Sequence, residues 1–229
     1  MLDKPPFAWY ADGMATPGQL VATLAEVLGI SAGTVALFDR ELAASGLRAK
    51  HGRGRSAAKV SASDAANLFV AVAAAPLSGT SIRFAARTCT DYCSLPIRQQ
   101  GSWNPSNFRK FGLPALSDLP DGHSLGEALR ALIESVARGQ AFHIPVRGEP
   151  PITDADDLFG IRFEGPQLWA EILADGSVGR GRTSQMARYV YSPAEAISRL
   201  TGDLRQSRSV TYATVRALGS LLAQWDRPS

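Results

Sequence analysis

The side chains in this sequence that are best suited to chemistry are a run of cations on a segment punctuated by glycine. Between Gly46 and Ser61 the chain has no acidic residue and five basic ones, namely Arg48, Lys50, Arg53, Arg55 and Lys59. The net charge of the whole chain is only +3, so the basic segment (residues 46–61) exceeds it. Charge concentrated in this way is typical of a contact with a polyanion. A solvated loop without a partner is the alternative interpretation.

The elements that must position these cations lie just before them. Thr16-Pro17 predicts the start of a helix, because threonine caps helices and proline fits the first helical position. Apolar residues then recur at helical spacing, at Leu20, Leu24, Val27 and Leu28. Gly29 suits the left-handed backbone of a tight turn, and Ser31 can cap a second helix over residues 32–44.

Residues 21–40 fit the spacing of a helix-turn-helix position by position. Ala25 is small where the helices would cross, and Val35 and Phe38 are apolar where the second helix would dock. We expect the second helix to present outward Gly33, Thr34, Ala36, Asp39 and Arg40. Thr34 and Arg40 could reach a base edge, and small residues permit close approach to a groove. An ordinary helical hairpin is the alternative.

The segment after the second helix favours a wing beside it. Ser45-Gly46 ends the helix, and residues 47–60 predict a short hairpin that contains Gly52-Arg53-Gly54-Arg55. Arginines flanked by glycines can also enter a narrow minor groove. Residues 61–64 then predict the start of a third, apolar helix that reaches about Ala74.

The segment formed by these residues resembles the winged helix-turn-helix of MerR-like regulators. It is also similar to the DNA-binding heads of phage-encoded transcription regulators and small terminase subunits. The resemblance covers about residues 16–77 and rests on residues 24–31, Thr34-Val35, Asp39-Arg40 and Gly46-Leu47. It implies binding of duplex DNA through this head. The long coiled coil of the MerR family is not evident, so effector sensing is not implied.

The sequence as a whole predicts four regions that differ in their secondary structure. We expect an N-terminal arm over residues 1–15, the winged helix-turn-helix over 16–77, an irregular connector over 78–122 with a candidate strand at 81–86, and an α+β C-terminal domain over 123–229. The fold class is therefore mainly α with small β, and the C-terminal domain would serve oligomerisation or partner binding.

The expected C-terminal domain contains a helix and a short antiparallel hairpin. Ser124 and Glu127 form a capping-box pair for a helix to Arg138. Alternating apolar residues predict strands at 158–164 and 168–172, which Gly165-Pro166 separates, with a partner strand over 184–191. Further helices are expected from Ser192-Pro193 and from Val210-Thr211.

The loop before the partner strand repeats the glycine–arginine pattern of the basic segment. Gly179-Arg180-Gly181-Arg182 offers a possible second basic contact through Arg180 and Arg182, or a solvent-exposed turn. Two short copies are not enough to indicate a duplication.

Signals of catalysis or of metal binding are weak. Asp154, Asp156 and Asp157 could in principle hold magnesium, but no phosphate loop or partner acid motif accompanies them. The three histidines, His51, His123 and His143, are widely separated. Cys89 and Cys93 are expected in a loop or strand as structural thiols. We therefore expect no enzyme activity, no cofactor and no metal site.

These observations favour a sequence-preferring DNA-binding transcriptional regulator. Its DNA-contacting residues would be Ser31, Thr34, Arg40, Arg48, Lys50, Arg53, Arg55 and Lys59. One weak recognition helix offers few base contacts, so a homodimer is expected. A DNA-packaging component of the small terminase kind and a protein-interaction adaptor are the alternatives. Because no apolar run approaches the about 18 residues of a membrane span, a cytoplasmic protein without membrane contact is expected.

Overall fold

The computed structural model describes residues 15–49, 59–76, 81–98, 106–146, 150–176, 186–193 and 205–223. Within these ranges the chain is a mixed α and β protein with eight α-helices and a five-stranded antiparallel sheet. The helices are α1 (Pro17–Leu28), α2 (Ala32–Ala44), α3 (Ala62–Ala73), α4 (Ala85–Cys93), α5 (Asn107–Lys110), α6 (Pro114–Ser117), α7 (Leu125–Ala137) and α8 (Tyr212–Ala223). Two 3₁₀ turns, η1 (Ser81–Phe84) and η2 (Asp156–Leu158), complete the helical part.

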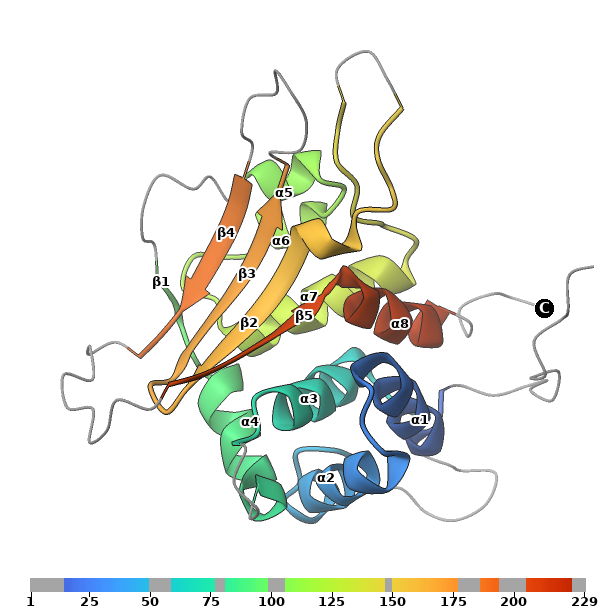
Figure 1. Cartoon of the computed structure of the whole chain (residues 1–229), viewed down its shortest axis with the longest axis vertical. Helices are drawn as coiled ribbons and strands as arrows, with labels where there is room; N and C mark the ends of the chain where they lie inside the picture. The colour runs from blue at the N-terminus through green and yellow to red at the C-terminus, as the bar shows by residue number, and fades with distance from the viewer. Residues whose placement is uncertain are drawn as a thin grey trace, which may run out of the picture.

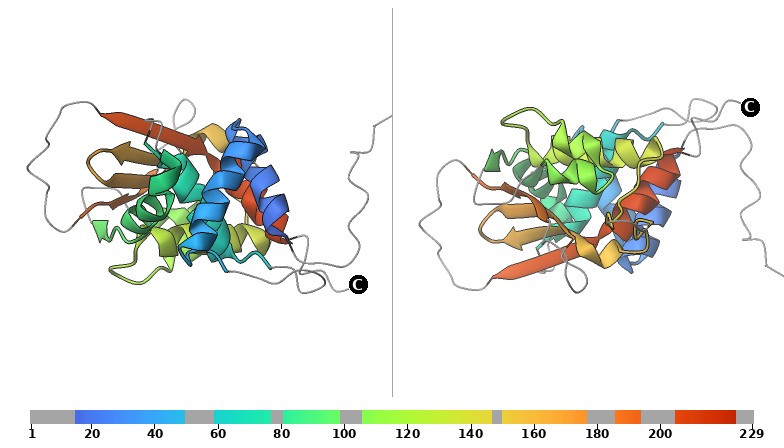
Figure 2. Two further views of the ribbon diagram at one scale, coloured as in Figure 1. Left: turned by 90° about the horizontal axis from the view of Figure 1, so that it is seen from below. Right: turned by 90° about the horizontal axis from the view of Figure 1, so that it is seen from above.

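The sheet is built around the expected hairpin. Its strands are β1 (Ile97–Arg98), β2 (Phe159–Gly165), β3 (Trp169–Asp175), β4 (Met186–Tyr191) and β5 (Gln206–Thr211), in the spatial order β1-β4-β3-β2-β5. Ile161 on β2 lies opposite Ile172 on one side and Val210 on the other, which places these apolar side chains on one face. The α-helices gather against one side and one end of the sheet (Figures 1 and 2).

Local capping signals set several helix boundaries where the sequence predicts them. Thr16, Ser61 and Ser124 each cap a helix, and each forms a reciprocal capping box with the residue three positions later. Gly29 ends α1 with φ of 65°, a left-handed backbone that glycine adopts without a steric clash. The expected bounds of α2 and the α7 prediction are confirmed.

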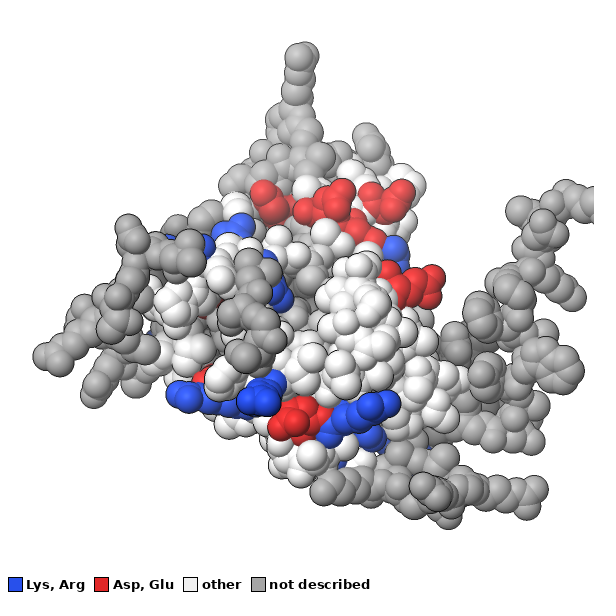
Figure 3. All heavy atoms as spheres, turned by 60° about the horizontal axis from the view of Figure 1, so that its bottom comes forward, with Lys and Arg blue, Asp and Glu red and all other residues white. Residues whose placement is uncertain are grey.

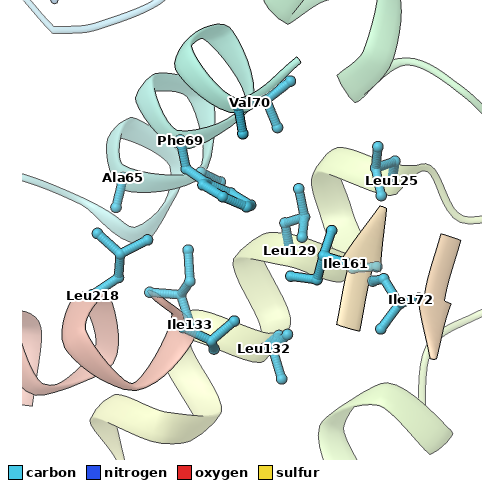
Figure 4. Close-up of a cluster of buried hydrophobic side chains, with 14 of the residues drawn as sticks. Ala65, Phe69, Val70, Leu125, Leu129, Leu132, Ile133, Ile161, Ile172 and Leu218 are labelled. Carbon is cyan, nitrogen blue, oxygen red and sulfur yellow. The ribbon is translucent and has the colours of Figure 1, made fainter. Parts of the chain in front are cut away.

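Helix α3 is the centre of the core. Ten of its twelve residues are buried, and it packs against α2, α4, α7, α8 and β5. Phe69 points toward Leu129 and Ile133 of α7, with Leu218 of α8 nearby (Figure 4). On the sheet side its ring meets that of Phe163 at 5.7 Å between centroids. One cluster of buried side chains therefore joins α1–α3 with α7, α8 and the sheet.

Two expectations about the middle of the chain are wrong. Residues 81–86 form η1 and the start of α4 instead of a strand, and Cys89 and Cys93 lie on α4 instead of on a loop or strand. The helical signal was present in buried residues spaced by three and four positions, at Ala85, Thr88, Cys89 and Tyr92.

The last helix begins later than expected. Val210 and Thr211 end β5, and α8 begins at Tyr212. The sequence of β5 is mostly polar, so alternation did not reveal a strand that is held in place by its pairing with β2. The expected helix from Ser192 falls largely outside the described residues, as does most of the N-terminal arm. None of the described helices is long and apolar enough to span a membrane.

The contact between α7 and α8 depends on Gly219. A Cβ atom added there would lie 2.4 Å from Val136 Cγ1 and 3.2 Å from the backbone nitrogen of Ala137. We expect Gly219→Ala to lower the free energy of unfolding by about 1–3 kcal/mol, because the helices must separate. Gly18→Ala in α1, where a Cβ meets nothing closer than 4.0 Å, is the matched control and should be neutral or slightly stabilising. Urea denaturation of both variants checks this, and equal effects would contradict the close packing.

Candidate functional site

The α1–α2 pair is docked by apolar side chains and closed by a capped turn. Leu24 of α1 and Val35 and Phe38 of α2 are buried. The backbone N–H of Ile30 donates to the carbonyl of Ala25, which holds the turn after α1. Ser31 then accepts a hydrogen bond from the backbone N–H of Thr34 at 3.2 Å. The sequence therefore folds locally into two short helices in a fixed relation.

The outward face of α2 has few charged or hydrogen-bonding side chains. Its exposed residues are Ala32, Gly33, Leu37, Arg40 and Ala44. Arg40 is the one cation among them, and Leu37 has 42% of its surface exposed. Ser31 is exposed and Thr34 half-buried, and their hydroxyl oxygens lie 2.8 Å apart. Small residues around one arginine leave a surface that another molecule could approach closely.

The expectation that Asp39 faces outward is wrong. Asp39 follows Val35 by one helical turn, so it shares the buried side of α2 with Phe38 and Leu42. Its Oδ1 lies 2.5 Å from Nε of Arg48, whose side chain is itself largely buried. Burial raises the pKa of Asp39 more than the charge of Arg48 lowers it. The Arg48 guanidinium is therefore directed at an internal acid.

One carboxylate, that of Asp64, binds described residues near both ends of the basic segment. Asp64 Oδ1 accepts a hydrogen bond from the N–H of Ala49 at 3.2 Å, and Oδ2 accepts from the N–H and the hydroxyl of Ser61 at 2.9 and 2.7 Å. The amide of Asn67 also donates to the carbonyl of Leu47 at 2.7 Å. Ala49 and Ser61 therefore both lie at the N-terminus of α3, beside the end of α2.

The expected DNA-contacting residues are only partly placed. Arg40 and Lys59 are exposed, and Arg48 is paired with Asp39. Lys50, Arg53, Arg55, Arg180 and Arg182 lie outside the described residues. On the face in Figure 3, most of the coloured acids gather toward the top of the view, and the coloured cations lie in separate small groups with uncharged areas between them. The part of the chain that the structure describes therefore shows no continuous basic patch on this face.

A second candidate site is a cavity of about 450 Å³ between the C-terminal end of α3, α4, the β2–β3 turn and β5. We call it the α3–β5 cavity. Its walls are mainly apolar, and Arg208 of β5, Asp91 and Tyr92 of α4 contribute polar groups. Sequence reasoning missed this site, because β5 and α4 were themselves missed.

The two cysteines lie close together on α4, and the hydrogen bond between them lowers the pKa of Cys89. Their sulfur atoms lie 3.9 Å apart on one face of α4, and both are free thiols. The neighbouring Cys89 sulfur and burial both raise the pKa of Cys93, so its thiolate is disfavoured. Across the described ranges, no three His, Cys, Asp or Glu residues gather in a way that could hold a metal ion.

Comparison of the chain with family models, curated proteins and solved structures finds no significant match.

The hydrogen bonds of Asp64 should contribute measurably to the free energy of unfolding. We expect Asp64→Ala to lower the free energy of unfolding by about 2–3 kcal/mol, because a carboxylate that accepts several hydrogen bonds is lost. Ser63→Ala, at an exposed neighbouring position of the same helical turn, is the control and should change stability by less than about 0.5 kcal/mol. Chemical denaturation measures both. Similar values for the two variants would show that Asp64 does not hold the segment.

The burial of His123 should make the stability of the fold depend on pH in the acid range. It is buried, with Nε2 3.0 Å from the Tyr191 hydroxyl and Nδ1 2.8 Å from the Pro120 carbonyl oxygen, and burial lowers its pKa. The unfolded chain therefore binds a proton more readily than the folded one. Stability should fall as the pH drops below the usual value of about 6.5, by at most about 1.4 kcal/mol per pH unit.

The variant His123→Gln should lose this part of the pH dependence, although its stability at neutral pH is also lower. His143→Gln, at a half-buried histidine whose Nδ1 lies 3.2 Å from the carbonyl oxygen of Ala141, should retain it. Thermal unfolding between pH 5 and pH 8 provides the comparison. An unchanged pH profile in His123→Gln would contradict the assignment to His123.

Proposed function

We propose that this chain binds duplex DNA as a sequence-preferring regulator, with α2 as the reading helix and the basic segment as the main electrostatic contact. The observation that carries the proposal is the Asp64 anchor. Ala49 and Ser61 are both bonded to this carboxylate, and four cations lie between these two residues in the sequence. A recognition helix accompanied by an adjacent basic loop is a common arrangement for groove binding.

The exposed face of α2 supports close approach to a groove. Gly33, Arg40 and Ala44 are exposed, and the small side chains would let the helix backbone come near base edges. In this proposal Arg40 contacts a base edge, and Ser31 and Thr34 lie near the backbone at the start of the helix. Phosphate contacts fix the orientation of such a helix, and base contacts select the sequence.

The cations of the basic segment have different parts in this proposal. Lys59 is exposed, and with Lys50, Arg53 and Arg55 it would supply phosphate or minor-groove contacts. Arg48 instead supports the base of the segment through its ion pair with the buried Asp39. Because one short helix provides few base contacts, we propose that two copies bind together on adjacent half-sites.

Two exposed apolar side chains favour a second candidate function, binding of a protein. Leu37 on α2 and Phe84 on η1 have 42% and 45% of their surface exposed, and α2 contacts η1. Large apolar side chains on one surface are typical of protein interfaces. In this case the same face of α2 would meet a protein partner and not DNA.

The test is binding of the purified chain to its own upstream DNA and to a scrambled duplex, measured by fluorescence anisotropy across a salt series. We expect Arg53→Ala combined with Arg55→Ala to weaken binding to both duplexes and to reduce the salt slope by about 2, because two phosphate contacts are removed. Arg40→Ala should reduce the preference between duplexes, by about 1–3 kcal/mol if it reads one base.

The control removes two charges elsewhere. Arg130→Ala combined with Arg138→Ala changes the net charge equally, at exposed positions on or next to α7. It should leave the salt slope intact. An equal loss in both double variants would indicate non-specific attraction, and no binding at low salt would reject the DNA proposal in favour of a protein partner.

A further inference from the structure

We propose that the α3–β5 cavity binds a small organic monocarboxylate with an apolar body, whose carboxylate pairs with Arg208. The cavity volume of about 450 Å³ suits a small organic molecule. This inference concerns a site on the opposite end of α3 from the basic segment, and it is independent of whether the chain binds DNA.

The pairing of β5 explains why Arg208 lines the cavity. Arg208 lies opposite Phe163, and Gln206 lies opposite Gly165. Directly opposed residues in an antiparallel pair share one face of the sheet. Since Phe163 is buried against Phe69 of α3, Arg208 is on the helix-facing side, where the end of α3 and α4 close over the sheet.

Arg208 is a cation without an acidic partner among the described residues. Its Nη1 donates to the carbonyls of Val72 and Ala73 at 3.3 and 3.4 Å, at the end of α3. No carboxylate in the described ranges lies within ion-pair distance of it. Burial lowers the pKa of Arg208, which reflects the cost of desolvating its charge. A guanidinium has five N–H donors, so donors remain for a ligand.

The other polar groups of the cavity restrict the ligand. Tyr92 donates its hydroxyl hydrogen to the Glu164 carbonyl at 2.6 Å, and burial raises its pKa to about 12, so it stays neutral. Asp91 also lines the cavity, and it pairs with Arg87 on α4 at 3.4 Å. A second acidic group on the ligand would meet the negative charge of Asp91. One anionic group near Arg208 is therefore favoured over a dianion or a polyphosphate.

The remaining wall fits an apolar body. It includes Ala73, Ala74, Ala75, Phe163, Pro166 and Leu168. An aromatic or aliphatic group in this space would exclude water from the arginine–carboxylate pair. Hydrogen bonds between arginine and carboxylate are stronger than neutral ones, and the two groups match in geometry.

A purely structural role for Arg208, as a cap for the carbonyls of α3, is the competing explanation. It predicts that the cavity does not prefer anions. Isothermal titration calorimetry of the full chain with 2-naphthoate, and with the neutral 2-naphthamide as the matched ligand, separates the two. We expect saturable 1:1 binding of 2-naphthoate and at least about tenfold weaker binding of 2-naphthamide.

Protein variants then locate the site. Arg208→Met should weaken binding of 2-naphthoate by about tenfold or more, and Arg208→Lys by less, because it keeps the charge. Arg205→Met removes an equal charge at an exposed position just before β5 and should leave binding unchanged. Ala74→Phe should block the cavity, whereas Thr90→Phe at an exposed position of α4 should not.

Circular dichroism confirms that each variant is folded. If Arg208→Met does not fold, the comparison of the two ligands and the Ala74→Phe variant still decide the question. Equal affinity for naphthoate and naphthamide, absence of saturable binding, or unchanged binding in a folded Ala74→Phe variant would each overturn the proposal.

Discussion

The burial of α3 on almost all sides is the constraint on which the rest of the structure depends. A helix in this position must be apolar around its circumference and small enough for its neighbours to approach, and the alanines of α3 meet both needs. Phe69 supplies the large side chain that reaches both α7 and the sheet. Both ends of this helix then need polar partners. Asp64 and Ser61 satisfy the N-terminal end, and Arg208 binds carbonyls at the C-terminal end.

The two candidate sites are consequences of how these ends are satisfied. At the N-terminal end, the carboxylate that completes the cap also accepts a hydrogen bond from Ala49. Residues near both ends of the basic segment therefore lie there. At the C-terminal end, the cation that binds the carbonyls also lines the α3–β5 cavity. A buried helix thus lies between the two sites. This is a spatial relation, and an energetic coupling between them would require that α3 or its neighbours have two arrangements.

The sequence predicts those parts of the fold that local interactions decide. The capping boxes at Thr16, Ser61 and Ser124 involve residues three positions apart, so their signal is complete within one helical turn. Strand β5 carries one aliphatic residue, Val210, and its place depends on pairing with β2, which is distant in the sequence. The buried residues of α1–α3 share one cluster with those of α7, α8 and the sheet, which are distant in the sequence. Periodicity identifies an apolar face and does not identify what covers it.

The surroundings of individual charged side chains are the part of the structure that the sequence alone could not predict. Arg48 belongs to a conspicuous run of cations, yet its Nε lies beside the buried Asp39 in the interior of the fold. Arg208 stands in an unremarkable polar stretch, yet the described residues place no carboxylate beside it, and an apolar cavity adjoins it. A cation that faces an internal acid has less to offer a ligand, whereas a partly buried cation without such an acid gains from binding an anion. For Arg48 and Arg208, the presence or absence of a nearby carboxylate in three dimensions therefore distinguishes the two side chains better than their sequence context does.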